Sequence, residues 1–333
     1  MRPIPGQLSN AHQKRGFTLV ELLVVVAIIA LLAAIAIRVV GGVLGNARKA
    51  ATQATLKKIQ ELLKSRVQAV DRHYGMQIKN PTKLNIAIPN LSPSASSSEY
   101  AGGNLARARV IYRKALFKTY FPQTWAEAAT AVADAGLTVP ASAAGGPSES
   151  SEVLYFLLTT ANVPGYEPVG VDAFTSAEVR DTDNDGMLEF IDSWGQPLRF
   201  YRWPTRLLKP TGDDGDDNNA SDINRDLASS LISGLPRLPA QLNQDLDDPL
   251  GLLSNGNWTT SGGVTVDRAR FETDFHTVTT YWSPLIVSPG PDLQLGLGEP
   301  NAGGTARLAA PASSDYSLIY DNISNLNLTG GGN

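Results

Sequence analysis

Residues 17–37, with the sequence FTLVELLVVVAIIALLAAIAI, decide the fold because they form an apolar run of 21 residues with a single charge, Glu21. A helix rises about 1.5 Å per residue, so this run spans roughly 30 Å, the thickness of the hydrocarbon core of a bilayer. Lys14 and Arg15 stand directly before the run, and positively charged flanks stay in the cytoplasm. The sequence therefore predicts one membrane-spanning helix over residues 17–37, with a cytoplasmic N-terminus and an exported C-terminal part.

Glu21 is the most informative residue of this run. A carboxylate inside a bilayer is costly unless it is neutralised or paired, so its presence implies a partner. A cut between Gly16 and Phe17 would create an α-amino group four residues away from Glu21. In neighbouring parallel helices the amine of one subunit could pair with Glu21 of the next. Such a pair would form only on assembly and would fix the axial register of the subunits.

An ordinary secretory signal peptide is the alternative explanation of the same run. Ala34-Ile35-Ala36 would then be its cleavage site. An acidic residue near the start of the run, and the length of the run, both argue against this alternative.

The helical pattern continues beyond the apolar run. Apolar residues recur at three- and four-residue spacing, at Leu56, Ile59, Leu63, Val67, Val70 and Tyr74. Polar residues fill the positions between them, namely Lys57, Lys58, Gln60, Lys64 and Arg66. No proline occurs from residue 17 to residue 74, and Gly75 is a suitable end for a helix. We expect one long helix over residues 17–75 whose second half packs on the domain that follows.

The composition restricts the remaining possibilities. The chain of 333 residues is 42% hydrophobic and 18% charged, as expected for a globular protein, and its formal net charge of −4 gives no reason to expect a nucleic-acid partner. The absence of cysteine excludes disulfides, thiolate metal sites and thiol nucleophiles. Helical patterns cover residues 104–120, 125–135 and 151–161, and strand patterns cover 198–203, 264–266, 277–281 and 285–287. Residues 76–333 are therefore predicted to form an α+β domain in which the long helix packs on an antiparallel sheet.

The segment KRGFTLVE, residues 14–21, resembles the prepilin signature of type IV pilins and of the pseudopilins of type II secretion systems. The resemblance implies that a prepilin peptidase removes residues 1–16 by cutting after Gly16, and that its methylase activity modifies Phe17. It also implies a pilin-like fold with a single span of the inner-membrane lipid bilayer and a periplasmic globular domain. The implied partners are an inner-membrane assembly platform, copies of the same chain and other pseudopilins, which together form a filament.

Residues 181–192, DTDNDGMLEFID, follow the spacing of a calcium-binding loop. Alternating acids can converge on one ion, Gly186 allows a sharp turn, and the position-seven carbonyl is a usual ligand. The candidate ligands are Asp181, Asp183, Asp185, the carbonyl of Met187, Glu189 and Asp192. A solvated acidic turn is the alternative, but five carboxylates within twelve residues repel one another, and a structural Ca²⁺ ion would relieve that repulsion.

Two further stretches resemble the major, G-class pseudopilins of type II secretion. Residues 192–201, DSWGQPLRFY, are similar to a D-x-W-G-x-P stretch of that class, and residues 286–292 with 321–323 are similar to its C-terminal loop. Members of the class are much shorter, so insertions are expected near residues 80–180 and 205–280. The resemblance implies a second calcium site formed by Ser288, Asp292 and Asp321.

Motifs for catalysis are absent from the sequence. Its three histidines, His12, His73 and His276, are isolated, and it contains no phosphate-binding glycine loop, nucleophile elbow or metalloprotease helix. We therefore expect a structural subunit of a type II secretion pseudopilus and not an enzyme. A surface type IV pilin for adhesion or motility is the alternative. A membrane-anchored enzyme or carbohydrate-binding protein is a more distant one, for which Trp194, Trp203, Trp258 and Trp282 would supply the sugar surface unless they belong to the core.

Overall fold

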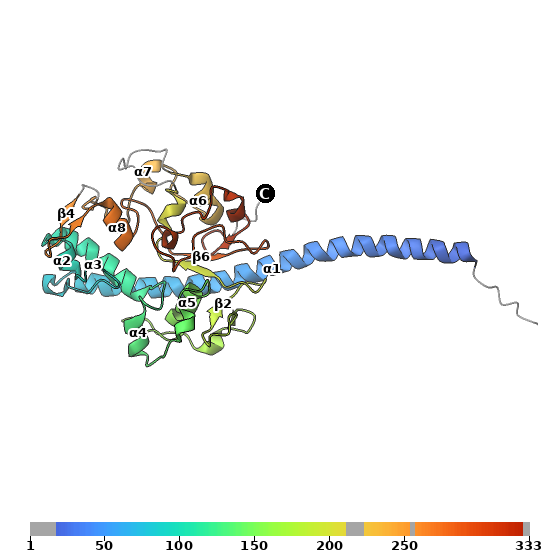
Figure 1. The fold of residues 1–333 in the computed structure, drawn as a ribbon, viewed down its shortest axis with the longest axis horizontal. Helices are drawn as coiled ribbons and strands as arrows, with labels where there is room; N and C mark the ends of the chain where they lie inside the picture. The colour runs from blue at the N-terminus through green and yellow to red at the C-terminus, as the bar shows by residue number, and fades with distance from the viewer. Residues whose placement is uncertain (1–17, 211–222, 254–256, 329–333) are drawn as a thin grey trace, which may run out of the picture. The chain divides into compact units, whose positions relative to one another are not determined.

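The structure, a computed structural model, describes residues 18–210, 223–253 and 257–328, apart from the side chains of residues 35–41. The expected leader, residues 1–16, lies outside this range. Two compact units divide the chain, one extending to Ala47 and the other beginning at Arg48. The helix α1 (Leu19–Gln77, 59 residues) belongs to both units and is drawn from blue to cyan in Figure 1.

The start of α1 is fixed by a capping box. The backbone amide and the hydroxyl of Thr18 each donate to the carboxylate of Glu21 at 2.8 Å, and the amide of Glu21 donates to the Thr18 hydroxyl at 3.2 Å. These bonds satisfy amide groups that the first helical turn cannot pair internally. At the other end the helix continues two residues past Gly75, and Pro81 begins the short 3₁₀ helix that follows, Pro81–Lys83. The long helix expected from the sequence is confirmed.

The two halves of α1 differ in burial. Large apolar side chains in the first unit are exposed, including those of Leu19 and Leu32, whereas the stripe that contains Leu56, Ile59 and Leu63 is buried in the second unit. In the described residues, no helix is both long enough and apolar enough to cross a membrane. Part of the span expected over residues 17–37 is not described, namely residue 17 and the side chains from residue 35 onward.

The second unit adds seven described helices and seven short strands. The helices are α2 (Ser97–Tyr100), α3 (Leu105–Tyr120), α4 (Ala129–Asp134), α5 (Glu149–Thr159), α6 (Arg225–Leu231), α7 (Pro239–Leu242) and α8 (Arg268–Asp274). The strands are β1 (Val179–Arg180), β2 (Glu189–Phe190), β3 (Arg199–Tyr201), β4 (Trp258–Thr259), β5 (Thr265–Val266), β6 (Leu285–Ser288) and β7 (Ile323–Ser324). The expected α+β class with a long N-terminal helix is confirmed.

All of the described strand pairs are antiparallel. The strands β3, β6 and β7 form a three-stranded sheet in that order, with Phe200 opposite Ile286 and Val287 opposite Ser324. The other two sheets are the hairpins β1–β2 and β4–β5. The three-stranded sheet lies outside both segments expected to be insertions, which contain α2–α5 and α6–α8. That these segments are insertions remains a prediction.

The strand expected over residues 277–281 is wrong. Thr279 has a φ of 51°, which interrupts an extended run. The threonine hydroxyls make local hydrogen bonds. That of Thr277 donates to Glu272 at 2.7 Å, and that of Thr280 donates to the backbone carbonyl of Val278 at 3.0 Å. Such local bonds compete with strand formation.

One large core joins α1 to the rest of the second unit. Its buried residues come from α1, α3 and α5 and from the strands β3 and β6, and Figure 1 shows α3 and α5 beside the second half of α1. Trp203, Trp258 and Trp282 are buried in this core, and Trp194 packs against it. The tryptophans therefore do not form an exposed surface for sugars.

Candidate functional site

The N-terminal processing residues can be placed only in part. Gly16 and Phe17 lie outside the described residues, whereas Glu21 lies in the first turn of α1 and is exposed. Its carboxylate is bonded to Thr18 of the same helix end, as described above.

The acidic loop connects the two strands of the β1–β2 hairpin. Its backbone turns at Asn184 and Gly186, whose φ angles are 62° and 94°. The carboxylate of Asp181 accepts from the amides of Asp185 at 3.2 Å and Gly186 at 3.0 Å, and Asp185 accepts from the amide of Met187 at 2.8 Å. Asp181 therefore holds the shape of the loop, while Met187 packs its side chain against a small apolar cluster that includes residues of α5.

Three carboxylates converge at this loop. Glu152, Asp183 and Asp185 each offer an oxygen, and the three oxygens lie within 4.8 Å of one another. Glu152 comes from the first half of α5, and its carboxylate accepts from the indole of Trp125 at 2.8 Å. The hydroxyl of Ser148, just before α5, donates to Asp183 at 2.6 Å. The structure thus joins the loop to the start of α5 through side chains.

The electrostatics of the group favour a cation. Burial raises the pKa of Glu152 to about 7, against smaller opposing effects from the nearby side chains of Trp125 and Ser148. Burial also raises the pKa of Glu189 to about 7, and the charges of Asp183 and Asp181 add to this rise. Glu189 is buried on β2 and accepts from the amide of Thr182 at 2.6 Å. Carboxylates with raised pKa values and negative neighbours are a suitable set of ligands for a hard cation.

Asp192 has a different position from that expected of a calcium ligand. One oxygen accepts from the amides of Trp194 at 2.8 Å and Gln196 at 3.0 Å, and the other accepts from the hydroxyl of Ser288 at 2.7 Å. These bonds tie the turn after β2 to β6. Of the six ligands expected from the sequence, the convergent group contains Asp183 and Asp185.

Glu152 is the member of the group that sequence reasoning missed. It lies in a segment expected to be an apolar helix, and a calcium-loop pattern considers only residues within the loop. A usable signal was nevertheless present, because Glu149 and Glu152 occur three residues apart at the start of that helix. Both are buried in the structure.

The second expected calcium site is assembled in part. Asp292 raises the pKa of Asp321 by its negative charge, an effect second to burial, so these two carboxylates lie near each other. Gly290, with a φ of 77°, allows the loop to approach the segment of Asp321, because a Cβ there would lie 2.6 Å from the Asp321 carbonyl oxygen. Ser288 turns its hydroxyl to Asp192 instead.

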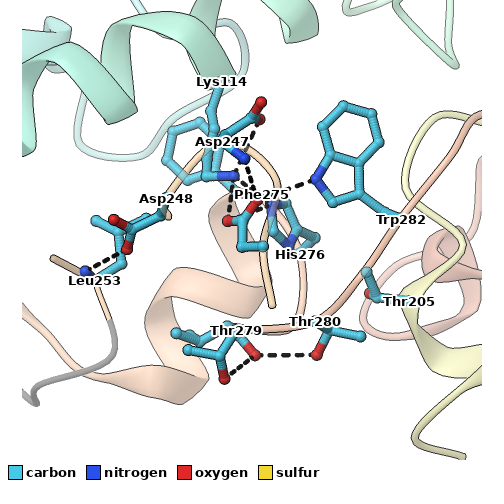
Figure 2. A network of polar contacts seen from close by, with 12 residues as sticks. Lys114, Thr205, Asp247, Asp248, Leu253, Phe275, His276, Thr279, Thr280 and Trp282 are labelled. Atoms are coloured by element: carbon cyan, nitrogen blue, oxygen red, sulfur yellow. Dashed lines mark hydrogen bonds and ion pairs between the residues drawn. The ribbon is translucent and has the colours of Figure 1, made fainter. Parts of the chain in front are cut away.

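A buried ionic network around Lys114 was not anticipated from the sequence (Figure 2). Its ammonium lies 2.6 Å from Asp245, 3.3 Å from Asp247 and 2.7 Å from Nε2 of His276. The other ring nitrogen of His276 lies 2.9 Å from the carbonyl of Thr277, so Nδ1 carries the proton and Nε2 accepts from Lys114. Burial and Lys114 lower the pKa of His276 to about 3.

The geometry of this network indicates a structural role. Lys114 and His276 are fully buried, which leaves a substrate no access to them. The network joins α3 to two loops of the region after residue 240, so it holds the second unit together without offering a reactive group.

The N-terminal segment of the chain matches a family model. Residues 11–37 match the prokaryotic N-terminal methylation motif. No curated protein and no solved structure matches the chain. The motif covers the expected cleavage site and Glu21, and implies processing by a prepilin peptidase and assembly with copies of the same chain. It therefore indicates a type IV pilin-like protein, that is, a structural subunit of a pilus or pseudopilus with a membrane-anchored N-terminus.

Proposed function

We propose that this chain is a structural subunit of a type II secretion pseudopilus. It is cut after Gly16, methylated on Phe17 and assembled from the inner membrane by packing of its N-terminal helices. Calcium stabilises its periplasmic domain. The methylation motif supports the filament role directly. The exposed apolar side chains of the first half of α1, from Leu19 to Leu32, supply the surface for lipid and for neighbouring helices.

Three distant stretches of sequence carry the pseudopilus part of the proposal, because they meet in one sheet. Residues 192–201, 286–292 and 321–323 contribute to β3, β6 and β7, which pair in that order. The bond from Ser288 to Asp192 joins the first two stretches again outside the ladder. The resemblance to pseudopilins therefore concerns one structural unit and not three separate matches.

Glu21 has a defined role in this mechanism. In the described chain its carboxylate accepts from Thr18. Cleavage exposes the amine of Phe17, and in the filament the amine of a neighbouring subunit pairs with this carboxylate. This pair neutralises the charge of Glu21 inside the bilayer. A lone subunit has no such partner, so the pairing favours assembly.

Processing and pairing can be tested on the full chain in its membrane. Mass spectrometry should find a mature N-terminus at methylated Phe17, and Gly16→Ala should slow cleavage sharply. Glu21→Ala should insert normally but assemble poorly. Glu61→Ala, which alters an exposed acid on the same helix, should assemble normally. A mature N-terminus after Ala36 would overturn the pilin-like role, and normal assembly of Glu21→Ala would overturn the pairing.

A surface pilus would share all of these results, so a further experiment separates the two filaments. Deleting the chain should stop secretion of exported proteins and leave surface pili and twitching unchanged. The opposite outcome would assign the chain to a surface pilus.

A further inference from the structure

The convergent carboxylates come from two separate parts of the chain. Asp183 and Asp185 belong to the β1–β2 loop, whereas Glu152 belongs to α5, and an oxygen from each lies within 4.8 Å of the others. Ser148 reinforces the junction through its bond to Asp183. A loop that bound calcium through its own residues would not require a carboxylate from this helix.

Glu152 provides an independent sign of a ligand. Its side chain belongs to a residue that is 1% exposed, and its Oε1 atom has no hydrogen-bond partner among the described residues. Among the described residues, Oδ2 of Asp185 and Oε2 of Glu189 are likewise buried and have no hydrogen-bond partner. Buried carboxylate oxygens are normally hydrogen-bonded, paired or bound to a metal. A cation at the loop would satisfy such buried oxygens, and Glu152 and Asp185 both belong to the convergent group.

The donor atoms select the class of cation. The group offers carboxylate oxygens, and the sequence has no cysteine to supply a thiolate. Oxygen donors suit Ca²⁺ and Mg²⁺ rather than Zn²⁺ or copper. Calcium accepts six to eight oxygens in flexible geometry, whereas magnesium demands a small octahedron and retains its waters. A site whose oxygens come from both a loop and a helix, with no small octahedral cage built for it, therefore fits Ca²⁺ better.

We propose that Ca²⁺ binds between α5 and the β1–β2 loop, with Glu152, Asp183 and Asp185 as its carboxylate ligands. Glu189, on the strand β2 that follows the loop, is a further candidate oxygen donor. This inference specifies the calcium part of the function proposed above. Binding links the hairpin to α5, so the ion connects two elements and does not merely stabilise one loop. We call this calcium-mediated link the clasp.

Terbium luminescence can detect this site in the full chain purified in a mild detergent. Tb³⁺ replaces Ca²⁺ at oxygen sites, and Trp125 bonds to Glu152 at 2.8 Å, so tryptophan excitation should sensitise terbium emission. Calcium should displace terbium, and magnesium should do so poorly. Trp125→Phe should lose most of the sensitised emission while calcium still raises its melting temperature.

Two variants test the contribution of α5. Glu152→Gln should lower calcium affinity by about tenfold or more, because affinity follows the number of charged ligands. The same variant should melt higher than the wild type in chelator, since it removes a buried charge; a merely misfolded variant would melt lower. Asp172→Asn, which alters an exposed acid of the same region, is the matched control and should bind calcium normally.

The outcomes separate this inference from the proposals it refines. If Asp183→Asn with Asp185→Asn abolishes binding and Glu152→Gln does not, the loop binds alone and the clasp is wrong. If binding disappears only in Asp292→Asn with Asp321→Asn, the site lies in the C-terminal loop and the clasp is again wrong. If the wild-type chain binds no calcium, the clasp and the calcium part of the proposed function both fail, while the filament role is unaffected.

Discussion

Arg66 shows how one residue can connect three helices. Its guanidinium donates to the carbonyls of Leu157 and Ala161, each at 2.7 Å, and to that of Tyr120 at 3.2 Å. These carbonyls lie at the C-terminal ends of α5 and α3, where the helix dipole favours a cation. In the sequence, Arg66 falls between the regularly spaced apolar residues of α1, where an exposed side chain is expected. In the structure it is only 1% exposed. Sequence periodicity cannot reveal a charge that is buried to cap other helices.

We expect Arg66→Met to lower the free energy of unfolding by about 3 kcal/mol or more, because it leaves three backbone carbonyls, two of them buried, without this donor. Arg66→Lys should recover only part of this loss, since an ammonium cannot span the same acceptors as a guanidinium. Arg72→Met removes a single bond to Gly165 from an exposed side chain and should cost less than about 0.5 kcal/mol. Urea unfolding measures all three. Equal losses for Arg66→Met and Arg72→Met would contradict the capping role.

His276 makes stability depend on pH. Its pKa is about 3 in the folded chain, below the ordinary value of 6.5, because burial and Lys114 oppose a second positive charge. A lowered folded pKa means that the unfolded chain takes up the proton first as pH falls. The contribution to stability is complete above pH 6.5 and is lost as pH falls from there toward 3, which amounts to about 2 kcal/mol by pH 5.

The variant His276→Gln isolates this effect, because glutamine can still accept from Lys114 but does not titrate. Its loss of stability between pH 7 and pH 5 should be about 2 kcal/mol smaller than that of the wild type. Denaturant unfolding at the two pH values measures the difference. Identical pH slopes for the two proteins would show that His276 is protonated in the folded state.

At the scale of elements, Asp192 connects the turn after β2 to β6 through Ser288. We expect Ser288→Ala to lower stability by about 1–2 kcal/mol, because a buried carboxylate oxygen loses its donor. Calcium affinity should not change, since these two residues lie outside the convergent group. Thermal melting and terbium titration of the same variant give both values. A large loss of affinity would instead return Asp192 or Ser288 to the ligand set expected from the sequence.

Elements with a strong local signal were predictable from the sequence. Periodic apolar residues gave α1 and α3, and the strands β3 and β6 lie within segments whose patterns indicated strands. The segment expected as a helix over residues 125–135 contains only α4, and residues 125–128 form turns in which Glu127 pairs with Arg202 at 2.8 Å. The candidate site was predictable where its residues follow one another, at Asp183 and Asp185. Glu152 joins them through tertiary packing, which no spacing rule contains.

On the scale of the whole molecule, the division after Ala47 separates a helix from a complete core. Each of the three buried apolar clusters draws its residues from position 56 onward. Gln53 on α1 donates to the carbonyl of Leu328 at 3.1 Å, so the second unit also contains the bonds that hold its last described residues.

A fragment of residues 48–333 should therefore fold cooperatively without the first unit. Its melting temperature should lie within a few degrees of that of the second unit in the full chain, because no buried cluster is cut. Calorimetry and near-ultraviolet circular dichroism measure both. A fragment that retains helical signal but shows no cooperative transition would mean that the first unit contributes to folding.

The order of the strands in the three-stranded sheet has a consequence for the export proposed above. The strand β6 lies between β3, near the middle of the chain, and β7, near its end. The sheet cannot close until residues 323–324 are available, and the bond from Gln53 to Leu328 joins the two ends of the domain later still. Contacts so distant in sequence form slowly. The second unit, which we propose to be periplasmic, would therefore complete this sheet only after its final residues have crossed the membrane.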